Sequence, residues 1–202
     1  MSEAHPSELL RWIPALPLAS AVLHGLWLAL VRRPFSRGLV IALSCGAVIA
    51  AFGVSCLAFV ELIRLPEAER ALADGLFTWI GSDNFSAEAA FRLDALSAVM
   101  TLVVTGVGSL IHVYSIGYMD DDHREDRGFQ RFFCYLNLFT FAMLVLVLAD
   151  NLVFTFLGWE GVGLCSYLLI GFDYGKLSTA DAGRKAFLVN RIGDVGFLIA
   201  MF

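Results

Sequence analysis

Long runs of apolar residues with few charges recur along the whole chain, and they restrict its fold more than any other feature. Of the 202 residues, 58% are hydrophobic and only 16% are charged, and the mean hydropathy is +0.74. Each run is close to the roughly 20 residues that a helix needs to cross a bilayer core. Because apolar character continues all round each run, a lipid-embedded helix is favoured over a one-sided amphipathic helix. The sequence therefore predicts an all-α, polytopic transmembrane helix bundle in the lipid bilayer.

Six membrane spans are predicted from these runs. They cover residues 9–31, 39–63, 93–119, 132–149, 152–172 and 186–202. The last span has only about 17 residues and no polar flank, so we expect it to be truncated in mid-helix. Pro14 and Pro17 fall in the first span, where a membrane helix tolerates them with a kink.

The longest polar connection, residues 66–92, separates the second and third spans. Its LFTWI run is followed by GSDNFS, a pattern typical of a short strand and a turn. We therefore expect a small extramembrane loop or hairpin here. The chain then divides into two N-terminal transmembrane helices (1–65), this extramembrane loop (66–92) and a larger membrane domain (93–202).

Basic residues are concentrated in three of the linkers. They are Arg32, Arg33 and Arg37 after the first span, Arg124, Arg127 and Arg131 after the third, and Lys176, Arg184 and Lys185 after the fifth. Since basic loops favour the cytoplasmic side of a membrane, these linkers are predicted to be cytoplasmic and the N-terminus to lie on the other side. The formal net charge is −5 with both signs mixed, so no nucleic-acid partner is predicted.

One acidic residue, Glu160, lies near the middle of the fifth predicted span. An ionised group at the bilayer centre costs at least about 2.5 to 3.5 kcal/mol, and such groups usually face a bundle interior and take part in transport. Burial favours the protonated carboxyl, whereas a nearby Lys or Arg favours the carboxylate, and a group between these limits can take up and release a proton. We interpret Glu160 as a proton-carrying residue. The alternative is a permanent ion pair that joins two helices.

The segment KAFLVNRIGDV of the sixth span carries Lys185, Arg191 and Asp194. Arg191 and Asp194 are three residues apart and can pair on one helix face, so we expect Asp194 to belong to the ion path or to orient Glu160. For Lys185, near the cytoplasmic end, an interfacial anchor is the favoured interpretation. His112 follows a Ser/Thr stripe on the third span and is either a proton relay at a channel mouth or a hydrogen-bonded structural histidine.

Three glycines lie close to Glu160 in the sequence, and the chain lacks the common metal-binding and nucleotide-binding motifs. Gly158, Gly161 and Gly163 are expected to allow close helix contact and local unwinding. The four cysteines lack CxxC spacing, and neither GxGxxG nor GK[ST] occurs. The sequence therefore predicts no catalytic residue, metal site or cofactor-binding residue in this chain, whether for haem, flavin or an iron–sulfur cluster.

Three stretches of the sequence resemble a known family. They are FRLDALSAVMTLVVTGVGSLIHVYSIGYM, LVLADNLVFTFLGWEGVGLCSYLLIGF and KAFLVNRIGDVGF, which cover roughly residues 91–202. Together they look like the antiporter-like membrane subunits of respiratory complex I, NADH-quinone oxidoreductase, and WEGVGLCSYLLIGF is specific for the subunit L (chain 5) family. On this resemblance, residues 93–202 are the N-terminal part of a proton-antiporter-like membrane domain.

The resemblance implies a proton-translocating subunit of an NADH:quinone oxidoreductase in a bacterial or mitochondrial inner membrane. It implies partners among the other membrane subunits, especially the neighbouring antiporter-like subunit. FMN, iron–sulfur clusters and quinone would be bound by partner subunits, with no redox chemistry in this chain.

The resemblance also implies roles for single residues. In that family, the Glu that matches Glu160 interacts with a Lys on the next helix. Asp194 and Arg191 match the family's acid and base on the sixth span, and His112 matches its His on the third. Because the central lysines of the family lie on later helices, no partner for Glu160 is predicted within this chain. Alternative functions are a cation/proton antiporter subunit, an inorganic-carbon uptake subunit with a zinc-containing partner, and a structural or assembly fragment.

Overall fold

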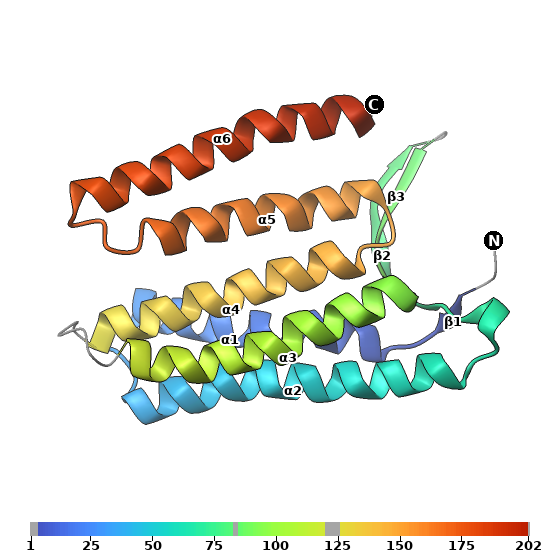
Figure 1. The fold of residues 1–202 in the computed structure, drawn as a ribbon, viewed down its shortest axis with the longest axis horizontal. Coiled ribbons are helices and arrows are strands. Elements are labelled where there is room, and N and C mark those ends of the chain that lie inside the picture. The colour runs from blue at the N-terminus through green and yellow to red at the C-terminus, as the bar shows by residue number, and fades with distance from the viewer. Residues whose placement is uncertain (1–3, 83–84, 120–125, 202) are drawn as a thin grey trace.

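A computed structural model describes residues 4–82, 85–119 and 126–201 of the chain. Within these residues the chain forms six α-helices and a small three-stranded sheet (Figure 1). The helices are α1 (Leu9–Leu30), α2 (Arg37–Arg64), α3 (Ala95–Tyr118), α4 (Asp126–Leu148), α5 (Leu152–Ile170) and α6 (Leu177–Met201). Helices α1 to α5 are long and apolar enough to cross a membrane, whereas α6, which contains the sixth expected span, does not meet this criterion in its described residues. The prediction of an all-α, polytopic membrane protein is confirmed.

Some positions singled out in the sequence lie outside the described residues. They are Asp83 and Asn84 of the expected turn, Arg124 of the second basic linker and Phe202 at the end of the last span.

Helix α6 begins at Leu177, nine positions before the expected span, and has 25 residues. The expected start was wrong because Asp181, Arg184 and Lys185 lower the hydropathy of this part of the chain. A helix nevertheless accommodates these charges: Arg184 Nη1 lies 3.6 Å from Asp181 Oδ1, three residues earlier. Helix α4 likewise begins before its expected span, so that Arg131 lies within a helix and not in a linker.

The helices lie side by side along the long axis of the molecule and alternate in direction (Figure 1). Helices α1 to α4 pack against one another, α5 packs on α4, and α6 packs on α5 at the edge of the bundle. The turn between α5 and α6 lies at one end of the bundle and the sheet at the other. The antiparallel arrangement therefore places the middle of α6 beside the middle of α5.

The sheet consists of β1 (His5–Pro6), β2 (Leu72–Ser82) and β3 (Phe85–Leu93) in that order. Strands β2 and β3 form an antiparallel hairpin, and β1 pairs in parallel with the start of β2. The expected hairpin after the second span is therefore confirmed.

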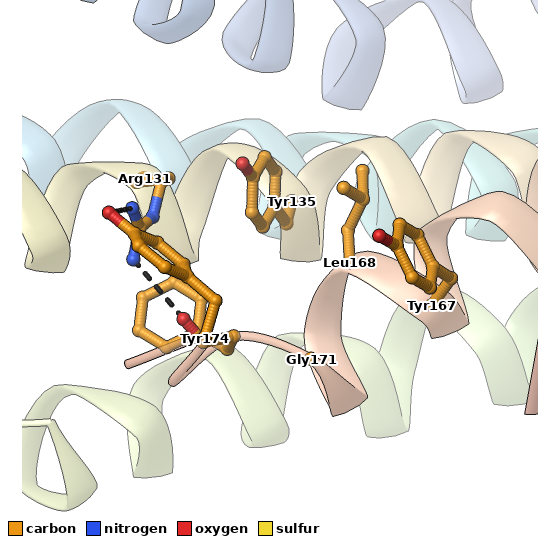
Figure 2. A pocket seen from close by; sticks show the side chains of 7 residues that line it. Arg131, Tyr135, Tyr167, Leu168, Gly171 and Tyr174 are labelled. Atoms are coloured by element: carbon orange, nitrogen blue, oxygen red, sulfur yellow. Dashed lines mark hydrogen bonds between the residues drawn. The ribbon is translucent and has the colours of Figure 1, made fainter. Parts of the chain in front are cut away.

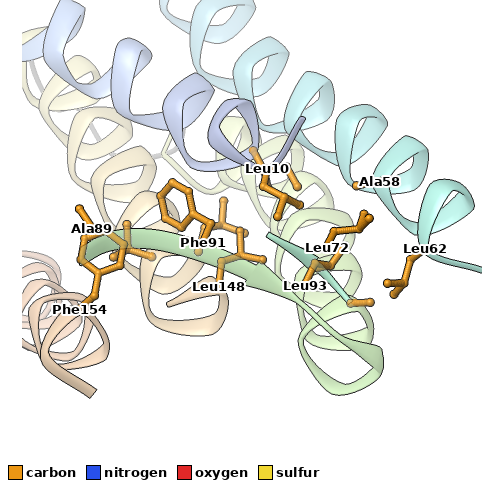
Figure 3. Close-up of a cluster of buried hydrophobic side chains, with 13 residues drawn as sticks. Leu10, Ala58, Leu62, Leu72, Ala89, Phe91, Leu93, Leu148 and Phe154 are labelled. Carbon is orange, nitrogen blue, oxygen red and sulfur yellow. The ribbon is translucent and has the colours of Figure 1, made fainter. Parts of the chain in front are cut away.

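The inner half of the hairpin is buried against the ends of several helices (Figure 3). Phe91 and Leu93 of β3 belong to one apolar cluster with Leu10 of α1, Leu148 of α4 and Phe154 of α5. These side chains are all buried, with at most 6% of any of them exposed, so they are removed from both water and lipid. The sheet thus fixes the ends of helices that are distant in sequence.

Strand β3 also holds the short turn between α4 and α5. The backbone N–H of Asp150 donates to the carbonyl of Ala90 at 3.1 Å, and the Asn151 side chain donates to the carbonyl of Glu88 at 2.7 Å. Asn151 also caps α5, because its side-chain oxygen accepts a hydrogen bond from the N–H of Phe154 at 2.9 Å. The start of α5 is therefore attached to the sheet.

Helix α5 comes very close to α4 at two of the glycines. A Cβ atom at Gly158 would lie 2.5 Å from the backbone nitrogen of Leu146, and one at Gly161 would lie 3.0 Å from the Cβ of Ala142. Small residues allow this approach between membrane helices. The expected close contact is confirmed, whereas α5 is continuous from Leu152 to Ile170 and shows no local unwinding.

We expect Gly158→Ala to destabilise the chain by roughly 1 to 3 kcal/mol, because backbone atoms of Leu146 and not a flexible side chain block the added methyl group. Thermal unfolding in detergent measures this loss. Gly163→Ala, on the same helix, is the matched control, since its Cβ would lie 3.9 Å from Asn190 Nδ2, an ordinary contact distance. Equal melting temperatures for the two variants would contradict the packing described here.

Helix α3 begins with a capping box just after the hairpin. Asp94 Oδ1 accepts hydrogen bonds from the N–H groups of Leu96 (3.0 Å) and Ser97 (2.9 Å), and the Ser97 hydroxyl accepts one from the N–H of Asp94 (2.7 Å). The bond from the Ser97 N–H is the main reason that the pKa of Asp94 lies below its ordinary value. The carboxylate form of Asp94 is therefore stabilised by folding.

Removing this cap with Asp94→Ala is expected to make amide hydrogen exchange in the first turn of α3 about fivefold faster, since a lost cap costs about 1 kcal/mol. Asp94→Asn keeps an acceptor and is the control.

Because the pKa of Asp94 is lower in the folded chain, the charge-dependent stability is present above the unfolded pKa and is lost as pH falls through the folded pKa. After correction for intrinsic exchange, wild-type protection in this turn should fall on acidification and that of Asp94→Asn should not. Equal protection in the Ala and Asn variants at neutral pH would rule out the capping role.

Candidate functional site

Glu160 of α5 pairs with Arg191 of α6 near the middle of both helices. The Arg191 Nη1 group donates to Glu160 Oε2, and the side chains are 23% and 42% exposed for Glu160 and Arg191. The expectation that the chain contains no partner for Glu160 was therefore wrong. The two residues are 31 positions apart, and they meet because antiparallel α6 returns along α5.

Arg191 also lies beside a second carboxylate. Its Nε atom is 3.5 Å from Asp194 Oδ2, as the spacing of three residues predicted. The Asp194 side chain is only 6% exposed, which makes it the most buried of the three charged groups. We refer to Glu160, Arg191 and Asp194 as the charged cluster.

Trp159 completes the contacts of this cluster. Its indole N–H donates to Asp194 Oδ1 at 2.7 Å, so one oxygen of Asp194 faces Arg191 and the other binds Trp159. The sequence did not lead us to predict this role of Trp159. The available signal was the indole N–H itself, since a Trp N–H in apolar surroundings usually finds a hydrogen-bond acceptor.

Aromatic rings lie on both sides of the charged cluster along α6. The Arg191 guanidinium is 4.7 Å from the ring centroid of Phe187, and the Trp159 ring stacks on Phe197 with centroids 6.2 Å apart. A guanidinium over an aromatic face is attracted by the ring quadrupole. These surroundings are of low polarity, and the addition or removal of one charge there changes the electrostatic energy more than it would in water.

The cluster has a simple charge balance. Two carboxylates and one guanidinium carry one net negative charge when all three groups are ionised, and a single proton makes the cluster neutral. Arg191 lies within ion-pair distance of both carboxylates, although its Nε atom makes no hydrogen bond to Asp194, so protonation of either carboxylate leaves the guanidinium beside the charge of the other. The arrangement can therefore hold one proton without leaving Arg191 unpaired.

The structure does not bring Lys185 or His112 to this cluster. Lys185 is exposed on α6 and makes no ion pair within the described part of the chain, so the cation of the next helix that contacts Glu160 is an arginine and not the implied lysine. His112 lies on α3, where its Nδ1 is 2.8 Å from the carbonyl oxygen of Gly108 and its ring packs 6.4 Å from that of Phe133.

Among residues 4–82, 85–119 and 126–201, no group of three or more His, Cys, Asp and Glu side chains is placed to hold a metal ion.

Two family models match the chain. NADH-Ubiquinone oxidoreductase (complex I), chain 5 N-terminus, matches residues 79–133, and NADH:quinone oxidoreductase/Mrp antiporter, TM, matches residues 149–202. The second region contains all three residues of the charged cluster.

Several curated relatives are each called NADH-quinone oxidoreductase subunit L. The protein of Mycobacterium tuberculosis (strain ATCC 25618 / H37Rv) is 47% identical over 190 residues, which are 93% of this chain and 28% of that protein. The protein of Escherichia coli (strain K12) is 44% identical over 187 residues, 93% of this chain and 29% of that protein. This chain therefore spans less than a third of the length of these relatives.

A solved structure has a similar fold. A chain in the structure of the Mrp complex from Dietzia sp. DQ12-45-1b superposes with a TM-score of 0.68 and 24% identity, over 95% of this chain and 19% of that chain. At this identity the likeness concerns the fold alone. The two matched regions and the similarity to the curated relatives over nearly the whole chain show that it belongs to the family of antiporter-like membrane subunits that includes subunit L of NADH-quinone oxidoreductase.

Proposed function

We propose that this chain is part of a proton-translocating membrane subunit of an NADH:quinone oxidoreductase. The observation that carries this proposal is the charged cluster itself, two carboxylates that share one arginine where the middle of α6 packs on α5, a helix apolar enough to cross a membrane. Intramembrane ionisable residues of this kind usually mark ion pathways. The names of the curated relatives support the choice of this enzyme complex.

In the proposed mechanism, a proton reaches Glu160 and neutralises its carboxylate. The attraction between Glu160 and Arg191 then weakens, and Arg191 pairs with Asp194, which already lies 3.5 Å from its Nε atom. Release of the proton restores the pair with Glu160. Trp159 holds Asp194 in place during this exchange through its 2.7 Å hydrogen bond.

The redox chemistry is assigned to other subunits of the complex. FMN, iron–sulfur clusters and quinone belong to those partners, and the neighbouring antiporter-like subunit is the direct membrane partner of this one. The complex would lie in a bacterial or mitochondrial inner membrane. Roles for Lys185 and His112 in the proton path stay predictions of the sequence, since both residues lie away from the charged cluster.

The alternative functions differ in what accompanies proton movement. A cation/proton antiporter would exchange sodium for protons without redox partners, and an inorganic-carbon uptake system would co-purify with a zinc-containing soluble protein. The curated relatives described above are named as oxidoreductase subunits, which favours the redox-coupled function. The proteins that co-purify with the full-length subunit distinguish the three functions. Flavin-containing and iron–sulfur subunits would support the oxidoreductase, a zinc-containing protein would support inorganic-carbon uptake, and sodium-dependent proton exchange without either would support the antiporter.

Glu160→Gln in the full-length subunit is expected to lower several-fold the number of protons moved per NADH oxidised, because the amide cannot carry the proton. Assembly should be unchanged, since the amide oxygen still accepts a hydrogen bond from Arg191. Proton uptake by reconstituted vesicles, measured together with NADH oxidation, gives this ratio.

The matched control is Asp181→Asn, which removes one carboxylate from the same bundle. Asp181 is exposed at the start of α6 and pairs with Arg184, away from the cluster. This variant should pump normally. Wild-type pumping per NADH in Glu160→Gln would show that the proposed role is wrong.

Trp159→Phe is expected to have a smaller effect in the same direction, because it removes the hydrogen bond to Asp194 and keeps a ring against Phe197. The same vesicle assay measures it. Trp12→Phe makes the same substitution on α1 and is a suitable control, since Trp12 is 56% exposed and Trp159 is 47% exposed. If Trp159→Phe and Trp12→Phe pumped equally, the hydrogen bond from Trp159 to Asp194 would have no part in proton movement.

A further inference from the structure

Arg131, which is not part of the charged cluster, lies beside the turn between α5 and α6, at the end of the bundle away from the sheet (Figures 1 and 2). The guanidinium carbon of Arg131, in the second turn of α4, is 4.6 Å from the ring centroid of Phe172 and 4.9 Å from that of Tyr174. Its Nη1 donates to the Tyr174 hydroxyl and its Nη2 to the carbonyl of Phe172, both at 3.3 Å. The guanidinium is therefore held in a fixed place.

None of these partners neutralises the charge of Arg131. Among the residues that the structure describes, no carboxylate oxygen lies within 4.0 Å of its guanidinium nitrogens, and its Nε atom is buried without a hydrogen-bond partner. The acidic residue of the same turn, Asp173, pairs with Lys176 at 2.9 Å. Because a partly buried cation is costly without an anion, this site is suited to an anionic ligand.

A cavity of about 210 Å³ opens next to Arg131. Besides Arg131 and its two aromatic neighbours, the side chains of Tyr135, Tyr167 and Leu168 line it. Figure 2 shows the rings of Tyr135 and Tyr167 among the side chains that line the cavity. A phenol hydroxyl donates one hydrogen bond, so the cavity combines a guanidinium with further donors for oxygen atoms of a ligand.

The cavity lies at the boundary of the membrane-spanning region. Arg131 is in the first turn of the apolar segment Gly128–Leu148, and Phe172 follows closely on the end of α5 at Ile170. The basic residues of the chain gather at this end, which the positive-inside rule assigns to the cytoplasm. Anionic lipids are concentrated in the cytoplasmic leaflet, and basic pockets between helices bind their head groups.

We propose that this cavity binds the phosphate group of an anionic phospholipid. Arg131 supplies the positive charge and its remaining N–H donors, and Tyr135 and Tyr167 supply hydroxyl donors. The bound lipid would join α4 to the turn that precedes α6. Inorganic phosphate offers the same oxygen atoms without acyl chains, so the test must separate the two ligands.

The first experiment counts the lipids retained by the membrane complex purified through a tag on the full-length subunit, using native mass spectrometry. Wild type should retain one more phosphatidylglycerol than Arg131→Gln. The control, Arg33→Gln, removes an equal charge from an exposed position at the same end and should match wild type. Tyr135→Phe, which keeps the ring, should weaken retention to a smaller degree even if Arg131→Gln fails to assemble.

The second experiment titrates the delipidated complex with short-chain phosphatidylglycerol, with short-chain phosphatidylcholine and with inorganic phosphate. We expect phosphatidylglycerol to bind wild type several-fold more tightly than either Arg131→Gln or Tyr135→Phe, and more tightly than phosphatidylcholine binds. Displacement of the lipid by equal concentrations of inorganic phosphate would overturn the assignment to a lipid. Equal lipid retention in wild type, Arg131→Gln and Tyr135→Phe would overturn the proposal as a whole.

Discussion

A charged side chain in the middle of a membrane-spanning helix must find an opposite charge, and Arg191 of α6 meets this requirement for Glu160 of α5. An unpaired ion at that depth costs at least about 2.5 to 3.5 kcal/mol, so the two helices are most stable when they lie together in this register. Asp194 and Trp159 extend the pair into a small network. The contact between α5 and α6 thus depends on the same groups that we propose to carry protons.

The rest of the fold places α5 accurately enough for this pair to form. Strand β3 holds the turn before α5, and Asn151 both binds the strand and caps the helix. Gly158 then lets α5 approach the backbone of α4. Helix α6, by contrast, packs mainly on α5 at the edge of the bundle, so its position depends on the ion pair, on the stacked rings and on the turn held by Arg131.

Sequence patterns predicted much of this structure, because hydropathy reports directly on membrane-spanning helices. The hairpin, the glycine contact of α5 and the pairing of Arg191 with Asp194 all followed from local spacing. The start of α6 was not predicted correctly. Its charged residues lower the hydropathy, but hydropathy does not show that Asp181 and Arg184 pair with each other within the helix. The Glu160–Arg191 pair was missed because it joins two helices, and local spacing carries no information about which faces meet.

The central claim is that Glu160 gains and loses a proton while Arg191 remains beside it. Infrared difference spectroscopy tests this claim directly in the assembled complex, by comparing the resting state with the state during NADH oxidation. We predict a change in the C=O stretching band of a protonated carboxyl group that is present in wild type and absent in Glu160→Gln. The same carboxyl band change in both proteins, or none in wild type, would contradict the account.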